Sequence, residues 1–203
     1  MFKNLFNSRL GQILTRLGDL ILLQLAFLVT SLPVVTIGAG ITALYSVSKK
    51  LRADSVSYTL PAYWAAFKEN FKTATALWLC LLAAAAVLLF DLRFCQNIPA
   101  AWAGYLQIFL YIVCIAVYLL FLYSFSQAAL FENRFVQYLK NSFRLAITHP
   151  GLTLLLTAIH ALFLVLAEYA RPLVFLIGVS GCIYLKTILL SKIYFPEQQN
   201  AEP

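Results

Sequence analysis

A stretch of 28 residues without a charged side chain, 20–47, constrains the fold more than any other part of the sequence. As one straight helix it would extend about 42 Å, which exceeds the ~30 Å hydrocarbon core of a bilayer. The whole chain is similarly apolar, with 62% hydrophobic and 11% charged residues. A soluble domain has about 25% charged residues, and so few charges would not cover its surface. The sequence therefore predicts an all-α, polytopic membrane helix bundle.

The same stretch carries helix-breaking residues near its middle. Pro33 lacks a backbone N–H and clashes with the preceding turn, and Gly38 and Gly40 loosen the backbone further. We therefore expect two half-helices, at about 20–31 and 37–47, with irregular backbone between them. Such backbone at membrane depth must be buried in protein or line a wet cavity.

Four further apolar runs are long enough to be membrane helices. A continuous apolar run favours a helix over a β-barrel strand, in which apolar and polar residues would alternate. The predicted architecture is one membrane domain at 1–196, with four full spans, a broken first segment that either spans or re-enters, and a polar tail at 197–203. The four runs lie at 73–90, 102–130, 152–170 and 173–193.

Two segments have the alternation of an amphipathic helix. In 1–18, apolar residues recur at helical spacing opposite a basic and polar face, which suits a helix lying in the membrane surface or one packed on the protein's own loops. In 131–148, a second basic amphipathic helix is expected, ended by the His149-Pro150 pair because a residue before proline avoids the α region.

The distribution of the 15 lysines and arginines predicts the orientation in the membrane. The positive-inside rule places the loops at about 48–72 and 131–148, together with the C-terminus, in the cytoplasm. If 20–47 spans once, the basic N-terminal tail lies outside, and ten of the 15 are inside. If 20–47 re-enters as a hairpin, thirteen are inside. The charge count favours a cytoplasmic N-terminus, although simple spans are commoner than re-entrant loops.

No residue set in the sequence points to catalysis. The chain has no G-x-S-x-G, H-E-x-x-H or P-loop motif, and its two histidines and eight acids build no site with ligand spacing. None of the four cysteines forms a C-x-x-C pair. We therefore expect no enzyme, no cofactor and no metal site. The net charge of +7 suits anionic lipid headgroups rather than nucleic acid, since no aromatic-basic module accompanies it.

The candidate functional residues fall into two groups. The first is the broken segment, and the second consists of polar residues within the predicted membrane helices, among which His160 is the ionisable one near mid-helix. We expect these polar residues to make interhelical hydrogen bonds, Lys186 to reach the cytoplasmic surface, and the pairs Asp91/Arg93 and Glu168/Arg171 to lie at the outer surface. The candidates are Ser31, Pro33, Thr36, Gly38 and Gly40 in the first group, and His160, Gln107 and Gln127 in the second.

Three stretches resemble the YesL-like family of bacterial integral membrane proteins, a domain of unknown function. They are 18–47 with its core SLPVVTIGAGITALY, FKENFKTATALW at 67–78, and LFENRFVQYLKNSFRLAITHP at 130–150. The resemblance implies a bacterial plasma-membrane protein with about five membrane helices. Members are often encoded beside carbohydrate ABC transporter genes, which implies an accessory role in uptake or sensing. It supplies no catalytic or binding residue.

Two functions follow as hypotheses. One is a non-enzymatic accessory or scaffold protein that contacts anionic lipids and docks on ABC transporter or sensor membrane proteins. The alternative is a small-molecule permease or channel, because interrupted helices mark substrate sites in transporters. Since the chain has one such segment and no inverted repeat, the permease would work as a homo-oligomer.

Overall fold

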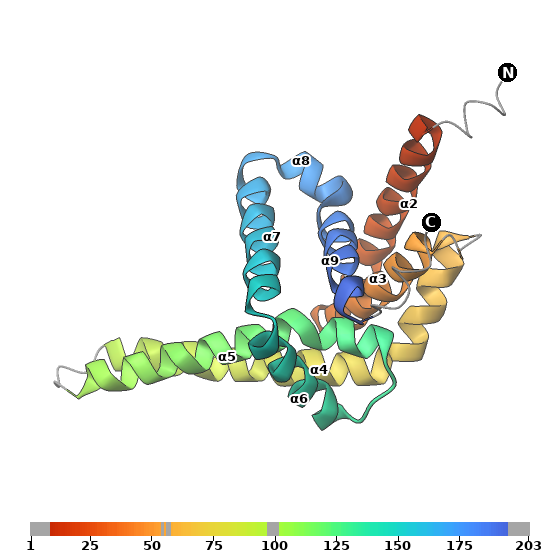
Figure 1. Ribbon diagram of the computed structural model, residues 1–203. Coiled ribbons are helices and arrows are strands. Elements are labelled where there is room, and N and C mark those ends of the chain that lie inside the picture. Colours follow the sequence, from red (N-terminus) through yellow and green to blue (C-terminus); the bar gives the residue numbers. More distant parts are fainter. Residues whose placement is uncertain (1–8, 54, 56–57, 97–101, 195–203) are drawn as a thin grey trace, which may run out of the picture.

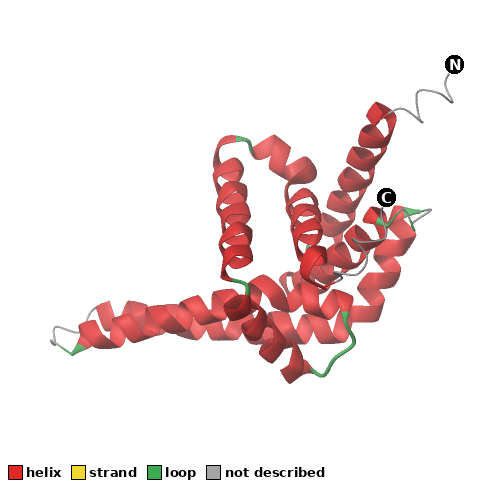
Figure 2. Cartoon of the chain, viewed as in Figure 1, coloured by secondary structure: helices red, strands yellow, loops and turns green. Residues whose placement is uncertain are grey.

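The protein is helical throughout the part of the chain described by its structure, a computed structural model covering residues 9–53, 55, 58–96 and 102–194 (Figures 1 and 2). Within these residues there is no strand, and the predicted all-α fold is confirmed. The elements are α2 (Arg9–Thr30), the 3-10 turn η1 (Val34–Thr36), α3 (Ile37–Arg52), α4 (Thr59–Gln96), α5 (Ala103–Leu130), α6 (Phe135–Thr148), α7 (Pro150–Tyr169), α8 (Arg171–Leu173), the π-helical turn η2 (Val174–Gly178) and α9 (Val179–Tyr194).

Five described segments are long and apolar enough to cross a membrane. Three of them, the segments from Ala103, Pro150 and Val174, begin and end within two residues of predicted spans. The His149-Pro150 pair and the Ala170-Arg171-Pro172 turn sharply delimit the segment from Pro150. The five segments are Gly11–Thr30, Thr59–Gln96, Ala103–Leu130, Pro150–Tyr169 and Val174–Ser191.

The first span differs from the expectation at its start. The prediction divides the chain between an amphipathic helix at 1–18 and a membrane segment at 20–47, whereas α2 runs through this boundary without a break. A single helical glycine such as Gly18 costs about 1 kcal/mol, too little to end a helix that continues on both sides. The Asp19 carboxylate, next to Gly18, accepts a hydrogen bond from Thr59 Oγ1 at 2.6 Å. Residues 1–8 and the tail at 197–203 lie outside the described residues.

The second span also begins earlier than the predicted 73–90. The structure has one helix, α4, where the sequence pattern indicated a loop, an interfacial aromatic segment and a membrane helix. Pro61 is compatible with this start because proline is tolerated in the first turn of a helix. Tyr63 and Phe67 are buried and stack at 6.3 Å between ring centroids, so packing extends the helix toward the N-terminal side.

The helices do not share one axis. In the view of Figure 1, α2, α7 and α9 stand upright, and the α4–α5 pair extends sideways from them. Helices α4 and α5 pack against each other, and α3 packs on α2, α4, α5 and α9. This places α3 at the centre of the molecule.

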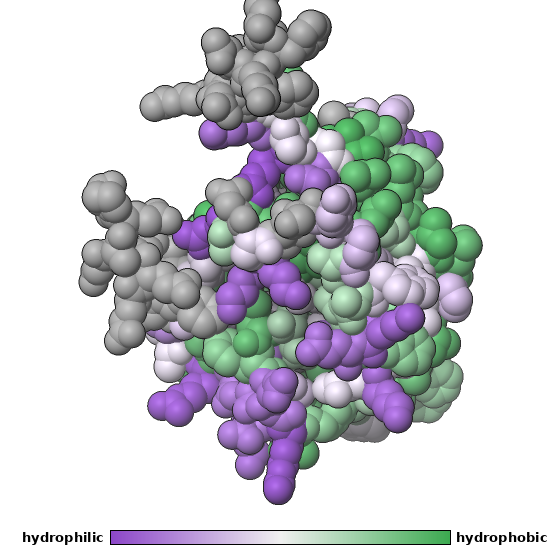
Figure 3. Space-filling model, turned by 90° about the vertical axis from the view of Figure 1, so that its right-hand side faces the viewer, coloured by the Kyte–Doolittle hydropathy of each residue, from purple (hydrophilic) through white to green (hydrophobic). Residues whose placement is uncertain are grey.

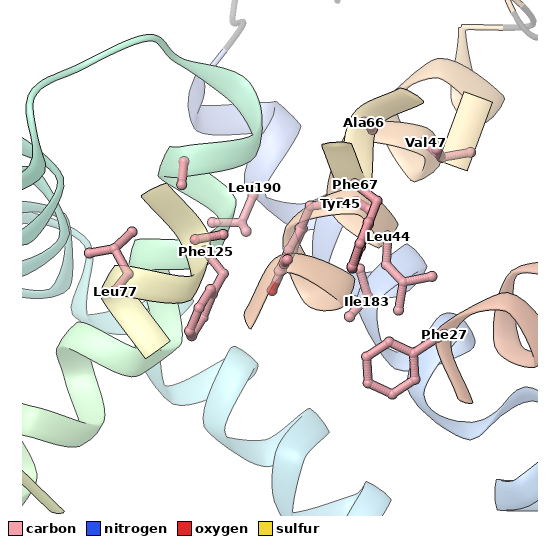
Figure 4. Packing of buried hydrophobic residues seen from close by; sticks show 14 of the residues in the cluster. Phe27, Leu44, Tyr45, Val47, Ala66, Phe67, Leu77, Phe125, Ile183 and Leu190 are labelled. Carbon is pink, nitrogen blue, oxygen red and sulfur yellow. The ribbon is translucent and has the colours of Figure 1, made fainter. Parts of the chain in front are cut away.

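The hydrophobic core forms around α3. Its side chains meet residues from the helices on every side, and Leu44, Val47 and Ala43 are fully buried. Figure 4 shows Leu44 and Tyr45 of α3 between Phe27 of α2, Phe67 of α4 and Ile183 of α9. The half-helix that the sequence placed after the break is thus the element on which α2, α4, α5 and α9 pack.

Candidate functional site

The break between α2 and α3 is a tight turn closed by hydrogen bonds. Thr36 Oγ1 donates to the carbonyl oxygens of Thr30, at 2.5 Å, and Pro33, at 2.7 Å. The Trp78 indole Nε1–H of α4 donates to the Val34 carbonyl at 2.8 Å. Carbonyls that the break removes from the helical ladder therefore have partners within the protein, as backbone at membrane depth requires.

Gly38 and Gly40 lie inside α3 and serve helix packing. A Cβ at Gly38 would lie 2.5 Å from Trp78 Cβ and 2.6 Å from the Ala74 carbonyl oxygen of α4. A Cβ at Gly40 would lie 3.0 Å from Phe27 Cδ2 of α2. The expected irregular backbone therefore ends at Thr36, and the two glycines let neighbouring helices approach closely.

The tip of the turn is apolar and exposed. Leu32 is 81% exposed, and Pro33, Val34 and Val35 are exposed beside it. The Ser31 hydroxyl is buried without a hydrogen-bond partner among the described residues. The five candidate residues of this segment thus form a hairpin turn and its packing, and no set of polar groups converges there on a common point.

A second site lies between α5, α7 and α9. Tyr118 Oη lies 3.2 Å from His160 Nδ1, and Lys186 Nζ contacts His160 Nε2. The predicted interhelical bonding of His160 is therefore present. The expectation that Lys186 reaches the membrane surface is wrong, since its side chain is buried at 4% exposure. The Cα–Cβ bond of a helical residue tilts toward the helix N-terminus, which directs this side chain back along α9 into the bundle.

A small cavity of about 90 Å³ adjoins this cluster. Its lining is mostly aromatic and aliphatic, with Lys186, His160, Cys182 and Tyr45 as the residues that carry polar atoms. The sequence offered only His160 as a signal for this site, because the placement of Lys186 depends on the direction of its side chain.

The two glutamines of the candidate set lie apart from that cluster. Gln127 is buried near the end of α5, where its Nε2 donates to Tyr194 Oη of α9 at 3.2 Å. Gln107 lies twenty residues earlier on the same helix, which corresponds to about 30 Å. The three predicted polar residues therefore belong to different parts of the structure.

Two open grooves flank the loop between α5 and α6. One, of about 510 Å³, lies between this loop, α6 and Tyr194 of α9, and its polar lining includes Asn141, Arg144 and His149. The other, of about 530 Å³, lies between the loop, α6 and the part of α4 that carries Glu69. Sequence reasoning missed both grooves, because their walls come from segments more than forty residues apart.

The loop between the grooves is held in place by a buried tyrosine. Tyr138 Oη donates to the Phe131 carbonyl at 3.0 Å and accepts from the Asn133 N–H at 2.9 Å. Phe131 packs edge-on against Tyr194, with 5.3 Å between ring centroids. The loop thus presents a defined shape between the two grooves.

Residues 20–92 match a family described as a protein of unknown function, DUF624. YesL-like proteins belong to this family. The DUF624 match covers the second half of α2, the turn, α3 and nearly all of α4, and so includes the central helix of the core. No curated protein and no solved structure matches the chain. The match supports the membrane-protein class and leaves activity open.

Proposed function

We propose that the protein is a YesL-like, non-enzymatic accessory protein of the bacterial plasma membrane that docks on a membrane protein of carbohydrate uptake or sensing. The observation that carries the docking role is the pair of grooves around the rigid loop 131–134, with volumes of about 510 and 530 Å³. Both are open and carry polar side chains, which suits a polar segment of another protein better than an enclosed small molecule.

The charges in the first groove indicate what kind of partner segment would dock there. The first groove carries Arg144 and His149 without an acidic side chain in its lining, and Lys140 is exposed on the same helix, α6. An acidic cytoplasmic segment of the partner would complement it. Figure 3 views the molecule from the right-hand side of Figure 1. Hydrophilic residues gather over the lower half of this face, whereas its right flank is hydrophobic.

The hairpin formed by α2 and α3 supports a cytoplasmic N-terminus. It therefore also supports a cytoplasmic position for the grooves around loop 131–134. The Arg16 guanidinium donates to the Leu51 carbonyl, and Thr59 Oγ1 donates to Asp19, so the start of α2 and the end of α3 lie together. With α2 and α3 as an antiparallel hairpin, thirteen of the 15 lysines and arginines fall on the cytoplasmic side.

The permease alternative has less support from the geometry. It was based on the interrupted stretch, and the contacts of Gly38 and Gly40 account for both glycines by helix packing. The link to carbohydrate uptake is based on the resemblance to YesL-like proteins, and the DUF624 match of residues 20–92 is consistent with it.

Site-specific photo-crosslinking in living cells tests the docking role. A photoreactive amino acid at Asn141 in the first groove or Gln137 in the second should yield adducts with one membrane transport or sensor protein. The same amino acid at Trp102, at the other end of α5, is the matched control and should not yield that adduct. Equal adducts from Asn141, Gln137 and Trp102, or adducts with lipid only, would contradict docking at this surface.

A further inference from the structure

A buried cation inside the bundle has no carboxylate partner among the described residues. Lys186 is 4% exposed, and its Nζ contacts His160 Nε2. A protonated lysine only donates hydrogen bonds, so Nε2 accepts, and the Nδ1–H then donates to Tyr118 Oη, 3.2 Å away. The three side chains form one hydrogen-bonded chain that carries a single positive charge.

The other neighbours of this charge do not neutralise it. Cys182 precedes Lys186 by one helical turn, and Tyr45 lies across the cavity on α3. The remaining walls are apolar, including the rings of Phe121, Phe125 and Phe163. In such surroundings a lysine keeps its proton only with a counter-charge close by, and it otherwise becomes neutral.

The cavity beside Lys186 limits what that counter-charge can be. Its volume of about 90 Å³ holds roughly three waters at ~30 Å³ each, which excludes sugars and nucleotides. One positive charge cannot balance a divalent anion, and strongly hydrated anions would lose too much hydration in these apolar walls.

We propose that this cavity binds one small, weakly hydrated monovalent anion of the halide class. Lys186 supplies the counter-charge, and His160, held by Tyr118, orients the ammonium group. The site is separate from the grooves around loop 131–134 and does not depend on the docking proposed for them.

Thermal unfolding of the purified full-length protein in detergent tests the site. Sodium bromide is compared with sodium gluconate at equal ionic strength, because gluconate is too large for the cavity. Bromide should raise Tm in a saturable manner, by about 3–6 °C at roughly ten times its Kd. Lys186→Met should abolish the difference between the two salts. Lys50→Met, which removes an exposed lysine of α3, should retain it.

A second measurement does not require the variant to fold. The ³⁵Cl NMR line of chloride should broaden with the wild-type protein, and bromide should reverse the broadening by competition. The proposal is overturned if wild-type Tm is the same in both salts and the chloride line shows no competable broadening. It is also overturned if folded Lys186→Met responds to bromide as the wild type does.

Discussion

A glycine can loosen the backbone or let a neighbouring helix approach closely. At Gly38 and Gly40, the neighbouring residues decide between these two roles. Beside Pro33, both glycines are expected to loosen the backbone of the predicted half-helix at 37–47, because glycine costs stability within a helix. In the structure they are helical, and the atoms of Trp78, Ala74 and Phe27 occupy the space next to their Cα atoms. The sequence places the turn correctly from Pro33 but cannot show which helices cross at the glycines.

Gly38→Ala should therefore destabilise the protein. Its Cβ would overlap the Cβ of Trp78 and the backbone oxygen of Ala74, neither of which is a flexible side-chain end. Separating α3 from α4 should cost about 1–3 kcal/mol, and Tm in detergent should fall by roughly 3–10 °C.

Gly18→Ala is the matched control for this prediction. Gly18 lies within α2 with nothing within 4 Å of a built Cβ, so alanine should leave Tm unchanged or raise it through better helix propensity. If Gly38→Ala were as stable as Gly18→Ala, the close approach of α3 and α4 would not be the role of Gly38.

At the scale of the elements, the sequence predicts which helices are present better than it predicts how long they are. The apolar runs gave α5 and α7 to within two residues, and Pro33 gave the α2–α3 turn. Helices α2 and α4 continue past their apolar runs into polar residues, because contacts made elsewhere, such as Thr59 with Asp19, stabilise those ends. Such contacts join residues forty positions apart and leave no local pattern.

The junction of α2 with the last span depends on one buried amide. Gln24 is 1% exposed, and its Oε1 accepts the Ser180 backbone N–H at 2.9 Å. Ser180 lies two residues after the π-helical turn η2, where backbone groups need partners outside the regular ladder. Ser180 Oγ in turn donates to the Leu20 carbonyl at 2.8 Å. Gln24 therefore ties the irregular end of the fifth span to the first.

Gln24→Leu should weaken this junction. The buried Ser180 N–H would lose its acceptor, at a cost of about 1–3 kcal/mol, and thermal unfolding followed by tryptophan fluorescence should show a lower Tm. Gln12→Leu changes an exposed glutamine on the same helix and should shift stability by about 0.5 kcal/mol or less. Equal effects of the two substitutions would show that the hydrogen bond to Ser180 contributes nothing specific.

For the whole molecule, the membrane-protein class could be predicted from composition, whereas the sites could not. Few charges and long apolar runs are sufficient to predict membrane helices. The first groove and the Lys186 cavity are formed where α5 meets α9 and further segments distant in sequence, and the second groove is formed by α4, the loop 131–134 and α6. The position of a buried lysine depends on the direction of its side chain, and the width of a groove depends on how the helices cross. Neither property produces a periodic pattern in the sequence.

The hairpin formed by α2 and α3 predicts on which side of the membrane its two ends lie. Testing this prediction decides whether the first segment spans the membrane once or re-enters. Because the Arg16 side chain donates to the Leu51 carbonyl, we predict that Gln12 and Lys50 lie on the same side of the membrane. Single cysteines are placed at Gln12, Lys50 and Trp102 after Cys80, Cys95, Cys114 and Cys182 are replaced by serine. In intact cells, a membrane-impermeant maleimide should label only Trp102→Cys, and all three positions should react after permeabilisation. Labelling of Gln12→Cys from outside, with Lys50→Cys protected, would instead require a single span, and the contact between Arg16 and Leu51 would then not exist in the membrane.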